Sequence, residues 1–490
     1  MNNKKNFITA IILQFVTIIS GLILPRLILS TFNSEINGLV SSITQFLSFI
    51  SLAEGGLGAV VLAELYKPIE FKDDKKIKQI LTECQNYFSK LTIIFIIYTI
   101  VLSIVYPLIC KSQFSFSFVS SLVIILSFST LIKYLFSITY KLYLQASQKI
   151  YIVNICSTVI TLLNLIVIFI IIKFTPSIHI IKIVADLLFI IQPIIFKKIV
   201  EKKYHVKLCL KKSNKKILKD RWSGFAQNLA HYVNMNTDIC VVTLLVGIKD
   251  VSIYSIYMLP IAALRNLISL ISNIYQSVLG KYYAKDDIDI LKSNFIKLQN
   301  INWVVSLILY GTCFLLIDDF VKIYTIGIND ANYYQPLFSG IMILATLLYS
   351  ILEPQKFLIL SVGKFKDIKK IYIVEAILNI VISIVLSIKF GLIGTALGTL
   401  IAVIYRFAYF ILYLRKNIIN IEIKNYVYPL LMTIFVIIIN IYFHYNYILN
   451  INNFYEFIIY GFLMFIVEAI LVIICFRKYI LRSLKAKKDA

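Results

Sequence analysis

Polar and charged side chains recur at helical spacing inside stretches that are otherwise apolar. One stripe, with intervals of four, three and four residues, consists of Gln227, His231, Asn234 and Asp238. A second stripe repeats these intervals with Arg265, Ser269, Ser272 and Gln276. Such intervals place side chains on one face of a helix. Because Arg and Asp are costly in lipid, they usually face a cavity or a partner, and the stripes predict helix faces that line a polar cleft.

The first apolar stretch carries a charge of its own. It reads GLILPRLILS from Gly21 to Ser30 and sets Pro25 beside Arg26. A guanidinium can give an anion two parallel hydrogen bonds, and Pro25 removes a backbone donor and can bend the helix. Arg26 also lies far enough along its helix to reach the outer membrane interface. Both a cavity position and an interfacial position are therefore open to it.

Stripes of small and polar residues mark two more helices. The first consists of Gln14, Thr17, Gly21 and Pro25. The second consists of Asn37, Ser41, Thr44, Ser48, Ser51 and Gly55. Small residues often pack helices together in membranes, and taken alone the second stripe favours packing.

The sequence predicts neither a catalytic nor a metal site. No nucleophile or metal-ligand motif accompanies the stripe that ends at Asp238. The seven cysteines form no CxxC pair, and the four histidines lack metal-ligand spacing. We therefore expect no catalytic residue, no metal, no cofactor and no enzymatic activity, although coupling to an H⁺ or Na⁺ gradient is open.

The composition predicts a membrane protein with many helices. Of 490 residues, 59% are hydrophobic and 15% are charged, and the mean hydropathy is +0.85. A soluble domain is roughly half apolar and a quarter charged. Apolar runs of about 20 residues, enough to cross a bilayer, recur throughout the chain. We predict fourteen helices, over 7–31, 36–62, 91–110, 116–138, 151–173, 177–196, 224–247, 251–279, 297–317, 334–358, 371–389, 391–412, 426–443 and 455–476.

The charge distribution predicts the orientation. With both termini in the cytoplasm, most of the 49 Lys and Arg residues fall on the cytoplasmic side, as the positive-inside rule requires. The largest basic cluster, from Lys197 to Trp222, predicts a loop near anionic lipid headgroups and not a nucleic-acid site. The apolar run near the N-terminus is too long for a signal peptide and predicts a retained helix.

An internal repeat predicts the domain organisation. The string KIYIV occurs at Lys149–Val153 and Lys370–Val374, each time opening a predicted helix that contains a Leu-Asn pair and ends in IKF. Since these are the fifth and eleventh helices, the repeats should have the same orientation. We predict an N-terminal lobe over 1–200, a C-terminal lobe over 201–415 that begins with the basic loop, and two additional helices with a basic tail over 416–490. The polar cleft should lie between the lobes.

Several of these stretches resemble a known family. LILPRLILSTFNSEINGLVSSITQFLSFISLAEGGLGAVVLAELYKPI (Leu22 to Ile69) resembles the opening of bacterial polysaccharide repeat-unit flippases of the Wzx type. These flippases belong to the multidrug/oligosaccharidyl-lipid/polysaccharide exporter superfamily. NTDICVVTLLVGIKDVSIYSIY (Asn236 to Tyr257) is similar to the join of helices 7 and 8 in that family, and LQASQKIYI (Leu144 to Ile152) to its helix 4–5 connector.

The resemblance implies a two-lobed transporter that alternates between inward-open and outward-open states in the cytoplasmic membrane. The implied cargo is an oligosaccharide repeat unit on undecaprenyl pyrophosphate, as in O-antigen, capsule or teichoic-acid-like polymers. Implied partners are anionic membrane lipids and other glycan-assembly proteins. The family's cationic cavity would map onto Arg26 and Arg265, and further onto Lys356 and Arg406, with the polar residues of both stripes beside the substrate. Acids for ion coupling would map onto Asp238 and Glu54.

Two other functions are compatible with the sequence. A cation-coupled multidrug exporter of the same superfamily would want an anionic or aromatic cavity, which Asp238 and the 32 tyrosines permit and the arginines disfavour. A membrane scaffold without transport would not explain the matching polar stripes.

Overall fold

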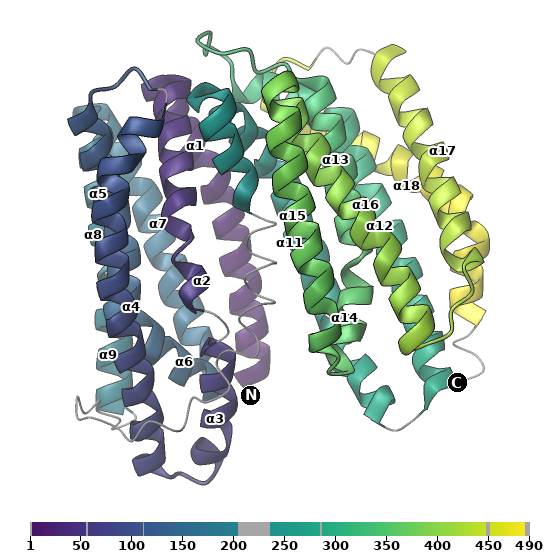
Figure 1. Cartoon of the computed structure of the whole chain (residues 1–490), viewed down its shortest axis with the longest axis horizontal. Coiled ribbons are helices and arrows are strands. Elements are labelled where there is room, and N and C mark those ends of the chain that lie inside the picture. The colour runs from purple at the N-terminus through teal and green to yellow at the C-terminus, as the bar shows by residue number, and fades with distance from the viewer. Residues whose placement is uncertain are drawn as a thin grey trace. The chain divides into compact units, whose positions relative to one another are not determined.

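The computed structural model describes residues 2–54, 57–110, 112–203, 236–284, 287–446 and 451–485, and every one of these segments is mainly helical. Within them, twelve helices are long and apolar enough to cross a membrane. The chain is therefore an all-α protein of the multi-pass membrane class, as predicted (Figure 1). The total of fourteen helices, the cytoplasmic position of both termini and the lobe boundaries stay predictions.

The helices form two compact units, each described here by itself. The first holds the described residues up to Lys203 together with Gly247–Ser252, and the second holds Asn236–Val246 and the described residues from Ile253 onward. The helices of the first unit are α1 (Asn2–Ser48), α2 (Ser51–Glu54), α3 (Leu57–Glu70), α4 (Asp74–Ile109), α5 (Phe116–Ile132), the π-helix η1 (Lys133–Ser137), α6 (Ile138–Ala146), α7 (Ile150–Phe174), α8 (Ile178–Phe189) and α9 (Ile191–Lys203).

The second unit begins with the short helix Asn236–Val246, whose last turn is the π-helix η3 (Val242–Val246). Its other helices are α11 (Ile248–Ala284, whose first five residues belong to the first unit), α12 (Ile288–Tyr324), α13 (Pro336–Ile351), α14 (Glu353–Ser361), α15 (Phe365–Phe390), α16 (Leu392–Asn417), α17 (Lys424–Asn446) and α18 (Phe454–Lys485).

The first two predicted helices differ from the structure. The helix α1 runs through Pro25 without leaving the helical conformation and turns at Asn33, whose backbone has φ 66° and ψ −178°. Asn tolerates positive φ better than most residues with a side chain, so the bend lies eight residues after the proline. The predicted helix 36–62 is interrupted, because α1 ends at Ser48 and the short helix α2 begins only at Ser51.

The two copies of KIYIV do not open their helices in the same way. The first copy begins α7, whereas the second lies inside α15, which already starts at Phe365. The Leu-Asn pairs and the IKF endings correspond more closely, since both helices end at the phenylalanine of IKF. The two copies therefore correspond better in the C-terminal halves of these helices than at their starts.

Small residues allow α15 and α16 to pack closely. The two helices are joined by Gly391 alone, at φ 56°, a conformation that glycine adopts without strain. A Cβ on Gly394 would overlap the backbone of Leu386, and one on Gly398 would overlap Ser383. This Gly-x-x-x-Gly spacing lets the helix backbones approach and fixes the register between Asn379 and Thr399.

The last two helices are held to α12 by buried polar contacts. Trp303 of α12 donates a hydrogen bond to Thr433 of α17 over 2.8 Å. Asn440 of α17 donates to the Glu468 carboxylate of α18 over 3.1 Å, and Glu468 lies against Gly311 of α12, where a Cβ would overlap it. All three helices therefore meet at the place where α12 has no side chain.

The contact between Gly311 and Glu468 predicts what a methyl group added at position 311 would do. Gly311→Ala should force Glu468 to move and destabilise the protein by about 1–3 kcal/mol, the usual cost of overpacking. The thermal unfolding midpoint of the protein in detergent should fall, and Glu468→Ala in the same chain should restore part of it. The control is Gly21→Ala on α1, where a Cβ would meet nothing within 4 Å. Equal midpoints for Gly311→Ala and the wild type would contradict this contact.

Candidate functional site

The interior of the second unit contains a charged pair at a depth where water is excluded. Arg406 of α16 lies 3.1 Å from the Glu375 carboxylate of α15, and both side chains are almost wholly buried. The guanidinium also lies 4.1 Å from the ring centroid of Tyr349 on α13, and 5.7 Å from that of Tyr372 on α15. Carboxylate and rings together compensate the cost of burying Arg406.

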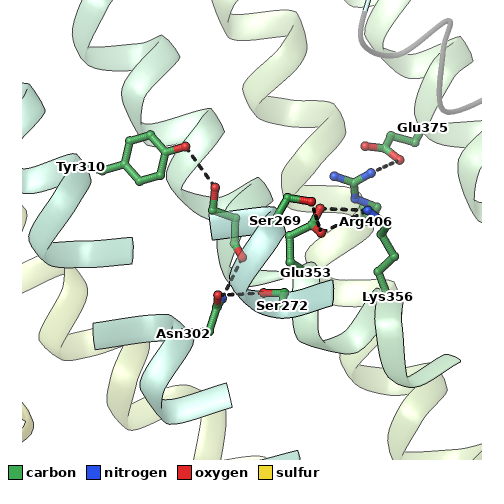
Figure 2. A network of polar contacts seen from close by, with 9 residues as sticks. Ser269, Ser272, Asn302, Tyr310, Glu353, Lys356, Glu375 and Arg406 are labelled. Atoms are coloured by element: carbon green, nitrogen blue, oxygen red, sulfur yellow. Dashed lines mark hydrogen bonds and ion pairs between the residues drawn. The ribbon is translucent and has the colours of Figure 1, made fainter. Parts of the chain in front are cut away.

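A second acid–base pair lies on α14. The Lys356 ammonium lies 3.0 and 3.1 Å from the two carboxylate oxygens of Glu353, one helical turn away. Ser269 of α11 donates to the same carboxylate over 3.3 Å. Figure 2 shows Glu353 between Lys356 and Ser269, with the Arg406–Glu375 pair close by. Lys356 and Arg406, two of the four predicted cations, are thus neutralised by carboxylates of the same unit.

Arg265 lies on α11 one turn before Ser269 and is half-buried. Its guanidinium is 5.9 Å from the centroid of the Tyr349 ring, the ring that also contacts Arg406. Tyr349 therefore stands beside two cations, and a ring so placed stabilises positive charge. Arg265 therefore adds a cation beside the ring that Arg406 also contacts.

Ser272 belongs to a network of hydrogen bonds between uncharged groups. Its hydroxyl donates to Asn302 of α12 over 3.2 Å, and Asn302 donates to the Ser350 carbonyl over 2.8 Å. The Ser350 hydroxyl lies 3.0 Å from that of Tyr310 (Figure 2). In this conformation the hydroxyls of Ser269 and Ser272 are therefore bonded within the protein.

Asp238 sits at the junction of three segments of the second unit. It is buried and accepts hydrogen bonds at Oδ2 from Thr399 of α16 over 2.9 Å and from Tyr254 of α11 over 3.1 Å. Asn379 of α15 donates to Thr399 over 3.1 Å. The other carboxylate oxygen of Asp238 has no hydrogen-bond partner among the described residues.

Asp238 and Arg265 have opposite charges and could in principle form an ion pair. The ion pairs found among the described residues do not include one between them. Arg265 is nevertheless close enough for its charge to act on the Asp238 carboxylate. Asp238 thus accepts hydrogen bonds from the hydroxyls of Tyr254 and Thr399, while Arg265 acts on it through its charge.

In the first unit, the residues before and after Arg26 pack into an apolar cluster. Leu24 and Leu27 contact a group of buried residues on α7 and α8, namely Ile168, Ile181 and Ala185. Arg26 itself is half-buried. The position of Arg26 in a cavity or at the interface stays a prediction.

Glu54, the second predicted coupling acid, already has a basic partner. Lys133 of η1 lies 3.0 Å from its carboxylate, and Tyr134 donates to the same oxygen over 2.6 Å. The side chain of Glu54 is 28% exposed and that of Lys133 is 52% exposed, so this pair is within reach of solvent. Glu54 is thus less suited than Asp238 to hold a proton or cation alone.

For four of the predicted substrate-binding residues, the structure describes no side chain. Gln227, His231 and Asn234 lie outside the described residues, and so does the side chain of Gln276, whose backbone belongs to α11. Among the residues that the structure describes, no group of three or more His, Cys, Asp or Glu side chains could hold a metal ion.

Neither a protein-family model nor a curated protein matches the sequence. Solved structures do match in fold. The lipid II flippase MurJ in an inward closed conformation superposes with a TM-score of 0.73 at 18% identity, over 97% of this chain and 100% of that one. An inward-facing multidrug resistance MATE transporter of the MOP superfamily gives 0.63 at 14% identity, over 81% of this chain and 94% of that one.

The chain has the fold of the MOP-superfamily transporters. A MOP-superfamily transporter from Pyrococcus furiosus, described as having a binding pocket of reversed polarity, matches with a TM-score of 0.51 at 13% identity over 84% of this chain and 96% of that one. At these identities the likeness concerns the fold alone.

Within the MOP-superfamily fold, the sequence pattern missed the acids that neutralise Lys356 and Arg406. Glu353 precedes Lys356 by three residues, a spacing that pairs charges on a helix and could have revealed it. Glu375 could have been noted as an isolated acid in an apolar helix, as could Glu468 on α18. Their partners Arg406 and Asn440 are distant in sequence, so the pairing itself required the fold.

Proposed function

We propose that the chain is a flippase, without enzymatic activity, that moves an undecaprenyl-pyrophosphate-linked oligosaccharide repeat unit across the cytoplasmic membrane by alternating access. The observation that carries this proposal is the extent of the likeness to the lipid II flippase. That match includes 97% of this chain, whereas the MATE transporter matches 81% of it. A flippase of lipid-linked glycan therefore accounts for more of the chain than a multidrug exporter does.

The charges inside the second unit support an anionic cargo. Lys356 and Arg406 form ion pairs with Glu353 and Glu375, and we assign the pyrophosphate to Arg265, on the polar stripe of α11, and to Arg26 of α1. A guanidinium binds phosphate oxygens through two parallel hydrogen bonds. The glycan is proposed to contact the polar residues of both stripes, namely Gln227, His231, Asn234, Ser269, Ser272 and Gln276. To do so, Ser269 and Ser272 must give up their present hydrogen bonds within the protein.

The proposal is tested by translocation in proteoliposomes. Purified protein is reconstituted with a fluorescent lipid-linked oligosaccharide, and the fraction that an added glycosidase can cleave is followed in time. With lipid labelled in the inner leaflet only, cleavage should rise with the protein and stay constant in protein-free liposomes. A cationic dye in the same vesicles tests the multidrug alternative. Dye transport without glycan movement would replace the flippase by an exporter.

Asp238 is proposed to couple transport to an ion gradient. Its second carboxylate oxygen has no hydrogen-bond partner among the described residues and is therefore available to a proton or Na⁺. Asp238→Asn keeps an oxygen that accepts from Tyr254 and Thr399 but removes the charge. We expect the acceleration of translocation by an imposed H⁺ or Na⁺ gradient to disappear, while the rate without a gradient and the protein yield stay close to wild type.

The matched control for this prediction is Asp289→Asn, which removes an exposed carboxylate in the first turn of α12. It should respond to the gradient like the wild type. If Asp238→Asn also responded like the wild type, Asp238 would be a hydrogen-bonding residue of the fold and another group would carry the ion.

A further inference from the structure

The second unit contains a pocket that is lined by none of the residues assigned so far. Its volume is about 500 Å³, within the range of roughly 300–1,000 Å³ that is usual for small-ligand sites. It lies at the C-terminal ends of α12 and α17 and beneath the connection from α12 to α13. Its polar lining includes Asp318, Asp319, Lys322, Tyr334 and His444. By the predicted orientation, these helix ends face the outside of the cell.

One wall of the pocket is fixed by Asp318. Its carboxylate lies 3.3 Å from the His444 imidazole of α17, and it accepts from Tyr257 of α11 over 3.3 Å and from Ser339 of α13 over 3.4 Å. The side chain is 10% exposed. Asp318 thus connects three other helices to α12, with Oδ1 accepting both hydrogen bonds and Oδ2 facing His444.

The connection above the pocket is fixed as well. The Tyr257 hydroxyl donates to the Tyr333 carbonyl over 2.8 Å and accepts from the backbone N–H of Gln335 over 3.0 Å. Tyr333 is buried, whereas its neighbour Tyr334 is 63% exposed. The pocket is therefore formed before any ligand arrives, which reduces the entropy lost on binding.

Two further charged groups in this fixed frame, Asp319 and Lys322, act on each other through their charges. Asp319 is half-buried and Lys322 is exposed, and neither forms a hydrogen bond or an ion pair with any described residue. They lie one turn apart on α12, beside the exposed ring of Tyr334. The pocket thus offers a carboxylate that accepts hydrogen bonds, an ammonium that donates them, and an aromatic face.

This combination restricts the ligand. Phosphate would be repelled by two carboxylates, a metal ion would meet the Lys322 ammonium, and an acyl chain would leave these charged groups without hydrogen bonds. Sugar hydroxyls both donate and accept, and the C–H face of a sugar ring can pack on an aromatic ring. We infer that this pocket binds one or two sugar rings of the glycan after it reaches the outer side, through Asp319, Lys322 and Tyr334.

This inference rests on the proposed function for the origin of the sugar, but binding can be measured without transport. The full-length protein in detergent is examined by saturation-transfer NMR with methyl glycosides of a hexose, an N-acetylhexosamine and an amino hexose. At least one should receive saturation from the protein. Asp319→Asn and Tyr334→Ala should each weaken its binding roughly tenfold, as expected for loss of one charged hydrogen bond or one ring contact.

The matched controls leave the pocket intact. Tyr455→Ala removes a tyrosine of α18 that is 75% exposed, and Asp289→Asn removes an exposed carboxylate of α12. Both should bind the sugar like the wild type. The inference is overturned if no glycoside binds, if the pocket variants bind like the controls, or if glycylglycine binds through Asp319 in place of the sugars.

The translocation assay separates this inference from the proposed function. A protein that binds sugar through Asp319 but moves no lipid-linked glycan would overturn the flippase proposal and keep the pocket. A protein that moves the glycan but gives no sugar signal would overturn the pocket and keep the flippase.

Discussion

Arg265→Ala is expected to reduce translocation of the lipid-linked glycan by about 100-fold, which corresponds to two charged hydrogen bonds of at least 1.4 kcal/mol each. Arg265→Lys keeps the charge but loses the paired geometry and should fall between Ala and wild type. The measurement is the initial rate of translocation in proteoliposomes at matched protein content. Arg26→Lys and Arg26→Ala should follow the same order with smaller losses.

Three controls distinguish anion binding from folding. Arg415→Ala removes an exposed arginine in the last turn of α16 and should leave the rate unchanged. Tyr349→Phe keeps the ring beside Arg265 and should retain most of the activity. The thermal midpoint of Arg265→Ala should stay near wild type. A folded Arg265→Ala protein that translocates at the wild-type rate would remove the best-placed cation from the mechanism.

Glu375→Gln is expected to have the largest effect on stability. It leaves the Arg406 guanidinium charged in the interior of the second unit without its carboxylate, and breaking a buried pair in this way costs about 3–5 kcal/mol. We expect a large fall in the thermal midpoint and in the yield of monodisperse protein. Because removal of both charges leaves neither uncompensated, Glu375→Gln with Arg406→Met should recover part of the loss.

The control for this pair is a surface pair of the same chemistry. Glu422 contacts Lys424 where both side chains are exposed, and exposed pairs contribute little. Glu422→Gln should therefore leave the midpoint unchanged. If Glu375→Gln were as stable as Glu422→Gln, the Tyr349 and Tyr372 rings alone would suffice to hold Arg406.

The sequence predicted the membrane class and several polar positions because these depend on composition and on helical spacing. Asp238, Ser269 and Ser272 all contact polar groups of the protein in the structure, and their place in a substrate cleft stays a prediction. The identity of those groups could not be predicted, since Thr399 lies 161 residues from Asp238 and Glu353 lies 84 residues from Ser269. Spacing indicates which face of a helix is polar but not whether substrate or protein covers it.

The bend in α1 shows a different limit. Pro25 lacks the backbone N–H that a helix interior needs, so it was the obvious place for a bend. The structure bends at Asn33, where a residue that tolerates positive φ stands close to the buried, hydrogen-bonded Asn37. Asn37 donates to Ser252 over 2.8 Å, a contact across 215 residues that local propensity does not contain.

The contact between Gly311, Asn440 and Glu468 has a consequence for biogenesis. When α12 leaves the ribosome, the space beside Gly311 is empty, because Asn440 and Glu468, which fill it in the structure, are made more than a hundred residues later. Glu468 is costly in lipid alone, whereas paired with Asn440 it can enter as one half of a hairpin. The last two helices should therefore insert into the membrane together and then pack against α12. A chain truncated between α17 and α18 would leave Asn440 in the bilayer without its hydrogen-bond partner Glu468.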